Sequence, residues 1–123
     1  MREVRFFKCN ICGNILGLIK NGGGTLVCCG EPMQELITNT ADASREKHVP
    51  VITKAGGKVT ADVGSVPHPM LEEHYIEWIA IVSEDAVQRK SLKPGDAPKA
   101  EFCCNGGDVT VYAYCNLHGL WKA

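Results

Sequence analysis

The stretch HYIEWIAIV, residues 74–82, decides the fold class of the larger part of the chain. It is rich in aromatic and β-branched residues and contains neither proline nor glycine, which is typical of a strand. Simple alternation places Ile76 with Trp78 on one face, and Glu77 with Ile79 and Ile81 on the other. Since Glu77 is the one polar residue that interrupts the second face, we expect this strand to be largely buried.

Further short apolar runs lie on both sides of this strand, separated by turn signals such as Ala55-Gly56-Gly57 and Asn105-Gly106-Gly107-Asp108. Strands separated by a turn every 8–12 residues or so predict an all-β fold, specifically an immunoglobulin-like β-sandwich. The polar stretch 38–47 is expected to hold one helical turn. The predicted strands cover residues 49–54, 58–63, 74–83, 87–92, 99–104 and 109–114.

The first 37 residues have a different texture, and we expect a separate domain over 1–37 followed by the sandwich over 38–123. Asn21-Gly22-Gly23-Gly24 predicts a hairpin turn between two short strands. A domain this small cannot fold on apolar burial alone, so a metal clasp is expected to hold it. Its candidate ligands are Cys9, Cys12, Cys28 and Cys29.

Four thiolates in one small hairpin select zinc or iron in tetrahedral geometry. Cys28 and Cys29 are adjacent, where zinc ribbons normally carry a second C-x-x-C. Neighbouring side chains usually point apart, so the tetrahedron should be distorted. Spacing alone leaves the choice between zinc and iron open.

All the histidines of the chain lie in conspicuous settings. Prolines at 50, 67 and 69 stiffen the loops that carry three of them. The fourth belongs to a C-x-x-H turn, which can deliver a thiolate and an imidazole to one ion. The candidate ligands of this second centre are His48, His68, His74, Cys115 and His118.

Five such ligands favour iron over other metals. Zinc prefers four ligands in a tetrahedron, and blue copper takes two histidines and a cysteine. Four neutral imidazoles and one thiolate suit a square pyramid with the sixth position open. A ferrous site of this kind carries about one net positive charge, which would attract a small anion. The thiolate opposite the open position would donate electron density to a bound ligand.

Composition excludes several other classes of function. The net charge is −1 and the basic residues are scattered, so no nucleic-acid partner is expected. No apolar run is long enough for a membrane span, and the N-terminus lacks the apolar segment of a signal peptide. Seven cysteines, six of them in tight pairs, favour metal binding in a reducing compartment. We therefore expect a cytoplasmic protein.

Over essentially its whole length, the sequence resembles desulfoferrodoxin, the two-domain form of superoxide reductase. The small domain is similar to the desulforedoxin module through FKCNICGNI (7–15) and LVCCGEPM (26–33). The larger part carries EKHVPVI (46–52), HPM (68–70), HYIEW (74–78) and YCNLHGLWK (114–122). Several long motifs in the same order make chance agreement very improbable.

The resemblance implies two mononuclear irons, one held by the four N-terminal cysteines and one by four equatorial histidines with axial Cys115. It implies the reduction of superoxide to hydrogen peroxide by one electron and two protons. Lys47 would draw in the anion and organise a proton-donating water, and Glu46 would supply a carboxylate for the open position once product has left. Rubredoxin or a similar small carrier would be the electron donor, and a homodimer is implied.

Three alternatives stay open on sequence alone. A superoxide dismutase would also oxidise superoxide to oxygen, and a non-catalytic iron electron carrier would not react rapidly with superoxide. A zinc-ribbon adaptor attached to a β-sandwich would contain zinc in place of iron.

Cys103 and Cys104 lie outside the family motifs. Because they are adjacent at the end of a strand, one side chain is expected to face inward and the other outward.

Overall fold

The computed structural model describes residues 4–104 and 107–123. The described chain separates into two compact units, one ending at Ile37 and the other comprising Thr38–Ala123. The turn predicted at 105–108 lies partly outside the described residues, because Asn105 and Gly106 do not belong to them.

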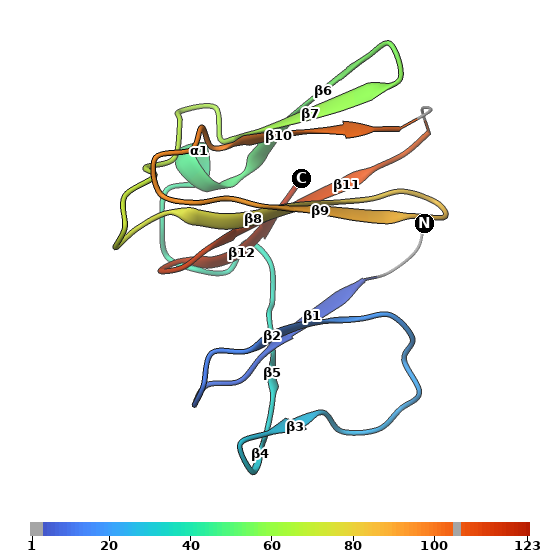
Figure 1. Cartoon of the computed structure of the whole chain (residues 1–123), viewed down its shortest axis with the longest axis vertical. Coiled ribbons are helices and arrows are strands. Elements are labelled where there is room, and N and C mark those ends of the chain that lie inside the picture. Colours follow the sequence, from blue (N-terminus) through green and yellow to red (C-terminus); the bar gives the residue numbers. More distant parts are fainter. Residues whose placement is uncertain (1–3, 105–106) are drawn as a thin grey trace. The chain divides into compact units, whose positions relative to one another are not determined.

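The larger unit consists of two antiparallel sheets, seen in the upper part of Figure 1. One sheet has the order β10-β7-β6 and the other the order β12-β11-β8-β9. Six of the seven strands match predicted ones, whereas the sequence reading did not predict β12. The strands are β6 (Pro50–Ala55), β7 (Lys58–Val63), β8 (Ile76–Val82), β9 (Val87–Ser91), β10 (Lys99–Cys103), β11 (Thr110–Cys115) and β12 (Gly119–Lys122).

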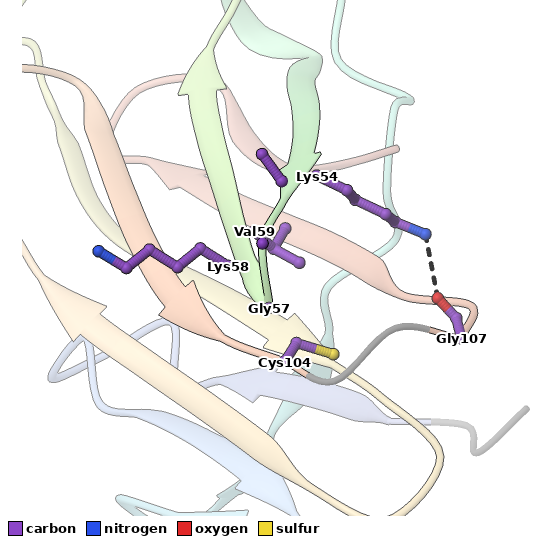
Figure 2. A pocket seen from close by; sticks show the side chains of 8 residues that line it. Lys54, Gly57, Lys58, Val59, Cys104 and Gly107 are labelled. Atoms are coloured by element: carbon purple, nitrogen blue, oxygen red, sulfur yellow. Dashed lines mark hydrogen bonds between the residues drawn. The ribbon is translucent and has the colours of Figure 1, made fainter.

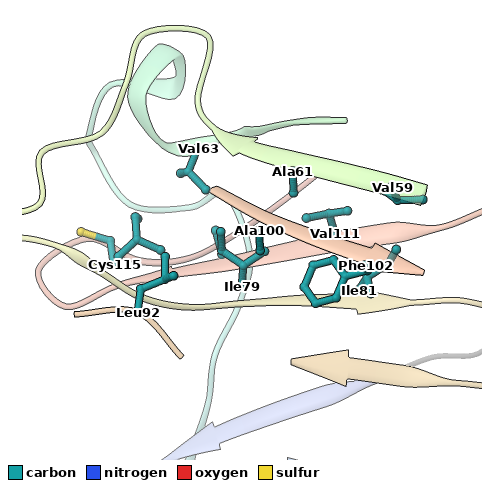
Figure 3. Close-up of a cluster of buried hydrophobic side chains, with 12 residues drawn as sticks. Val59, Ala61, Val63, Ile79, Ile81, Leu92, Ala100, Phe102, Val111 and Cys115 are labelled. Atoms are coloured by element: carbon teal, nitrogen blue, oxygen red, sulfur yellow. The ribbon is translucent and has the colours of Figure 1, made fainter. Parts of the chain in front are cut away.

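The two sheets pack face to face over one apolar core, which confirms the expected β-sandwich (Figure 3). Alternate residues of β7 and β10 supply one side of this core, and alternate residues of β8 and β11 supply the other. Val59, Ala61 and Val63 face Ile79, Ile81 and Val111 in this way. Cys115 is the last core residue of β11, so the core reaches the end of the sandwich where the histidines gather.

A β-bulge at Glu77 corrects the predicted faces of the central strand. Tyr114 pairs with Trp78 and Cys115 pairs with Ile76, so Glu77 is an extra residue on β8. The alternation therefore reverses across Glu77, and Ile76 joins Ile79 in the core instead of sharing a face with Trp78. The expectation of a largely buried strand is confirmed, since all residues of β8 except Glu77 are buried.

The smaller unit contains a three-stranded sheet of order β2-β1-β5 and the short pair β3-β4. Its buried side chains are only Phe6, Cys9 and Met33 among the residues described there, too few to hold it by apolar burial. The predicted hairpin around Asn21–Gly24 is wrong, because β2 pairs with β1 and β3 pairs with β4, leaving residues 19–26 as a loop. The strands are β1 (Arg5–Lys8), β2 (Ile15–Leu18), β3 (Val27–Cys28), β4 (Glu31–Pro32) and β5 (Gln34–Glu35).

One helical turn, α1 (Arg45–His48), precedes β6 and overlaps the end of the stretch where a turn was expected. Within the described ranges, no helix has the length and apolarity needed to cross a bilayer.

Candidate metal centres

Four cysteine sulfurs come together in the smaller unit, and their ligand atoms lie within 4.8 Å of one another. Cys12 Sγ lies 3.6 Å from Cys28 Sγ, which lies 4.0 Å from Cys29 Sγ. A tetrahedron with metal–sulfur distances of about 2.3 Å has edges of about 3.8 Å. The sulfur spacing therefore fits one tetrahedral ion at this site.

Backbone conformation explains how two adjacent cysteines can serve one ion. Cys29 has φ = 51°, the left-handed region that non-glycine residues rarely adopt, and Gly30 follows with φ = 76°. This reversal turns the Cys29 side chain toward the same point as that of Cys28, although neighbouring side chains in an extended strand point apart.

The protonation of the cysteine cluster also favours a cation. The backbone N–H groups of Cys12 and Ile11 point at Cys9 and lower the pKa of its thiol to about 6. Hydrogen bonds with the sulfurs of Cys12, Cys9 and Cys28 raise the pKa of Cys29 to about 12. Four crowded sulfurs cannot all be thiolates without a positive charge among them, and a metal ion supplies that charge.

The second cluster lies at one end of the sandwich and contains all four histidines with Cys115. The ligand atoms of His48, His68, His74 and Cys115 lie within 4.8 Å of one another. His118 completes the group, with Nδ1 lying 3.1 Å from His48 Nε2 and 4.0 Å from Cys115 Sγ. The structure thus brings together all five residues that the sequence predicted for this centre.

The four imidazoles form a square rather than a tetrahedron. Around the ring of His48, His68, His74 and His118, neighbouring planes meet at 78°, 82°, 83° and 81°. His48 and His74 lie on a diagonal, with centroids 6.4 Å apart and planes within 30° of each other. His68 Nε2 and His48 Nε2 are 3.1 Å apart, close to the edge of about 3.0 Å for a square with metal–nitrogen distances of about 2.1 Å.

Backbone carbonyls fix two of these rings with their lone pairs facing the cluster. His48 Nδ1 donates to the carbonyl of Ser44 at 2.6 Å, and His68 Nδ1 donates to that of Pro69 at 2.7 Å. A carbonyl can only accept, so the proton of each neutral ring must lie on Nδ1 and the free lone pair on Nε2.

Two further atoms of this cluster are left without the partner that a metal would provide. His74 Nε2 is buried and has no hydrogen-bond partner, a rare condition for a polar atom. Cys115 is 0% exposed, and burial raises the pKa of its thiol, although the backbone N–H groups of His118 and Leu117 act in the opposite direction. A metal ion would satisfy the histidine and stabilise the thiolate.

Three of the histidines are held in the form that binds metals. Burial lowers the pKa of His48 and of His74, and it lowers that of His68 to about 4. These imidazoles are therefore neutral near pH 7, with a lone pair available for coordination. Together with His118 and the buried thiol, they form a site that fits a single five-coordinate ion.

The helical turn α1 places two charged residues directly before His48. Glu46 and Lys47 are both exposed, whereas His48 is 3% exposed. The charge of Lys47 lies close enough to contribute to the lowered pKa of both His48 and His74. Cys115 occupies the core side of the cluster.

A hollow lies at the turn of the β6–β7 hairpin (Figure 2). Lys54, Lys58 and Cys104 line it, and Lys54 Nζ donates to the carbonyl of Gly107 at 3.0 Å. Cys103 is exposed, while Cys104 is half-buried and packs against the core, as expected for adjacent residues of a strand end.

Several residues that support the histidine centre were not identified from the sequence. Trp121 stacks on His48 with centroids 4.9 Å apart, and its Nε1 donates to the carbonyl of His118 at 3.0 Å. Asn116 bonds to the backbone beside His74. Asn116 lies inside the C-x-x-H motif and Trp121 shortly after it, so the sequence offered a signal for both. The backbone carbonyls that orient His48 and His68 could not be identified from residue type.

Comparison with known proteins agrees with this geometry. Residues 40–123 match the desulfoferrodoxin family, and residues 1–36 match the desulfoferrodoxin N-terminal domain. The chain is 53% identical over 124 residues to a desulfoferrodoxin homolog of Archaeoglobus fulgidus, covering 100% of this chain and 99% of that protein. It is 52% identical over 121 residues to a desulfoferrodoxin of Nitratidesulfovibrio vulgaris, covering 98% and 96% of the two chains.

A solved structure supports the same assignment over the whole chain. The crystal structure of the superoxide reductase from Treponema pallidum matches with a TM-score of 0.80 and 35% identity, covering 99% of each chain. With two metal sites, a matching fold and matching sequence over its full length, this chain belongs to the desulfoferrodoxin family.

Proposed function

We propose that this protein is a superoxide reductase, which converts superoxide, one electron and two protons into hydrogen peroxide. The observation that carries this conclusion is the square of four imidazoles, two buried and two half-buried, with a buried thiol on its core side. Both sites are assigned to iron, as in the family to which the chain belongs. The metal ligands are Cys9, Cys12, Cys28 and Cys29 in centre I, and His48, His68, His74, Cys115 and His118 in centre II.

Iron held by these five residues would supply the electron for superoxide, and the Cys115 thiolate would donate electron density to the metal. The protein's own contribution begins with charge. Neutral imidazoles and one thiolate leave a ferrous centre with about one positive charge, and Lys47 adds another on the solvent side. The anionic substrate is therefore attracted to the side away from Cys115.

Lys47 also has a role in proton delivery. Its ammonium group can hold a water beside the open face, and that water supplies a proton to the reduced substrate. Glu46 precedes it on α1 and would offer a carboxylate as a further ligand for the metal after product release. For both residues, the support is their place on α1 next to His48 and the family motif EKHVP at 46–50.

Counting products tests the reaction. The fully reduced protein is mixed anaerobically with a pulse of superoxide, and oxygen and peroxide are measured together. A reductase forms one peroxide per superoxide and no oxygen. Evolution of one oxygen per peroxide would establish a dismutase instead, and a slow reaction of the reduced protein would establish a pure electron carrier.

Two substitutions, one that removes the charge of Lys47 and one that keeps it, test the role of this residue. In Lys47→Ile, we expect superoxide capture to slow by about tenfold or more and to lose part of its dependence on ionic strength. Lys47→Arg keeps the charge and serves as the matched control. Loss of iron from Lys47→Ile would show that the lysine is structural. Equal rates of superoxide capture in Lys47→Ile and Lys47→Arg would exclude electrostatic steering by this residue.

The boundary between residues 37 and 38 is proposed as the domain boundary, supported by the compact units and by the two family matches.

We propose a homodimer paired through the small units, supported by the exposed apolar side chains of Ile11, Ile19 and Val27. Sedimentation of the full chain and of Ile19→Lys tests this, since a wild-type monomer would exclude it.

Rubredoxin or a similar small carrier is the proposed electron donor, by resemblance to the family. Mixing reduced rubredoxin with the oxidised protein tests this, and failure to reduce centre II at any concentration would exclude that donor. The cytoplasm is the proposed location, because none of the seven cysteines forms a disulfide. Cell fractionation tests this location.

A further inference from the structure

Asn116 joins the two parts of centre II that carry three of its ligands. Its Oδ1 accepts from the backbone N–H of Tyr75 at 2.9 Å, and its Nδ2 donates to the carbonyl of Glu73 at 3.0 Å. Its own N–H donates to the carbonyl of Tyr75 at 3.2 Å. The side-chain amide thus holds the backbone immediately before and immediately after His74.

His74 depends on such support more than its neighbours do. The rings of His48 and His68 are each oriented by a backbone carbonyl through Nδ1, whereas neither ring nitrogen of His74 makes a hydrogen bond to any of the described residues. The position of the His74 ring is therefore set mainly through its backbone. The isolated bridge between Leu71 and His74 holds the backbone of His74 itself, and Asn116 holds the residues on either side of it.

Asn116 itself lies between two more ligands, in the turn from Cys115 to His118. Any shift of this turn is transmitted through the amide to His74, and any shift of His74 is resisted by the turn. A side chain that bonds to both flanks of one ligand while lying between two others sets their relative positions.

We propose that Asn116 is a positioning residue that fixes His74 relative to Cys115 and His118 and so keeps the square of ligands closed. The inference rests on metal binding at centre II, as in the proposed function. Asn116 touches neither substrate nor metal, so its loss acts on iron retention before it acts on chemistry.

Two substitutions separate the parts of this clamp. Asn116→Ala removes both side-chain hydrogen bonds and leaves the backbone one. Asn116→Asp keeps an acceptor for Tyr75 N–H but opposes a carboxylate oxygen to the carbonyl of Glu73, so it loses one bond and adds a repulsion. Neither variant introduces glycine or proline, so the backbone conformation at position 116 is preserved.

The chain offers a matched control in the same unit. Asn39 makes an equivalent pair of side-chain bonds, accepting from the N–H of Lys122 at 2.8 Å and donating to its carbonyl at 3.2 Å. Neither Asn39 nor Lys122 adjoins a metal ligand. Because Asn39 has φ = 58°, the control is Asn39→Gly, which removes the two bonds without backbone strain.

The experiment measures iron release from the full chain loaded with both irons and exposed to a strong ferrous chelator. Centre I serves as an internal standard, since its four cysteines lie in the other unit. We expect centre II of Asn116→Ala to release iron about 10–100-fold faster than wild type, and Asn116→Asp to fall between the two. Asn39→Gly should release iron at the wild-type rate, and centre I should be unaffected in every variant.

Three readouts make the result decisive. The ferric absorption band of centre II should shift in both Asn116 variants but not in Asn39→Gly, which a general loss of stability would not produce. Wild-type iron release and an unshifted band in Asn116→Ala would overturn the proposal, and so would equal acceleration in Asn39→Gly. If Asn116→Ala does not fold, Asn116→Asp decides by the same criteria. A wild-type protein that holds iron yet fails to reduce superoxide would refute the proposed function while leaving this comparison valid.

Discussion

Replacing Gly64 by alanine tests whether close packing beneath α1 holds the histidine centre in place. A methyl group at this position would overlap the carbonyl oxygen of Glu46 and lie 3.0 Å from the carbonyl carbon of Lys47 and from the carbonyl oxygen of Val49. All three are backbone atoms, which cannot rotate away as a side chain does. Gly64 adopts no positive φ, so the effect of the substitution is purely steric.

The size of the effect follows from the space that is missing. The backbone of α1 must retreat by about 1 Å to restore ordinary van der Waals separation, and overpacking of this kind costs roughly 1–3 kcal/mol. For a unit of this size, about 2 kcal/mol lowers the melting temperature by roughly 10 °C. The same retreat moves Lys47 and His48 by about 1 Å, enough to slow a positioned reaction by about 100-fold.

The assay combines thermal unfolding, iron content and the rate of superoxide reduction by the reduced full chain. Gly17→Ala is the matched control, because a methyl group there meets only Phe6 at ordinary contact distances of 3.5 and 3.7 Å. A Gly64→Ala protein that melts, binds iron and reacts like wild type would refute the reasoning. A fall in stability without a fall in rate would show that α1 can move without disturbing the centre.

Three further predictions concern other parts of the molecule. Cys9→Ser should abolish the colour of centre I and unfold the small unit, which increased sensitivity to proteolysis would reveal. The pre-reduced protein should still reduce superoxide at the wild-type rate, and a loss of that activity would show that centre I is essential. Because the pKa of His68 is about 4, below its usual 6.5, the unfolded chain binds its proton first on acidification. The metal-free protein should thus keep its full stability above about pH 6.5 and lose up to about 3 kcal/mol by about pH 4. Equal urea midpoints at these two pH values would contradict this prediction. Trp121→Phe keeps an aromatic ring beside the centre but removes the hydrogen bond to the carbonyl of His118, so we expect a loss of about 1 kcal/mol in denaturant unfolding with iron retained, whereas iron-free protein would show that the indole bond is essential.

The sequence was informative wherever residue type and spacing carry the chemistry. Period-two patterns and turn residues predicted six strands of the sandwich, and the ligand residues were visible because thiols and imidazoles at such spacings have few other uses. β12 was not predicted, because GLWK (119–122) is short and directly follows the turn that carries His118.

What could not be predicted depends on contacts between distant segments. The bulge at Glu77 arises from pairing between β8 and β11, which alternation along β8 cannot reveal. The predicted hairpin at Asn21–Gly24 failed because β1 took β2 as its partner, a tertiary choice that overrides local turn preference. The left-handed conformation of Cys29 was likewise invisible, since a cysteine gives no indication of positive φ.

The spread of the ligands along the chain has a consequence for how the protein matures on the ribosome. The cysteine cluster is complete once Cys29 has been made, whereas the histidine square needs His118, roughly 90 residues and several seconds of translation later. A nascent chain can therefore acquire its first metal while the second binding site still lacks ligands. In iron-limited cells, newly made chains labelled by a short pulse should therefore contain centre I more often than centre II.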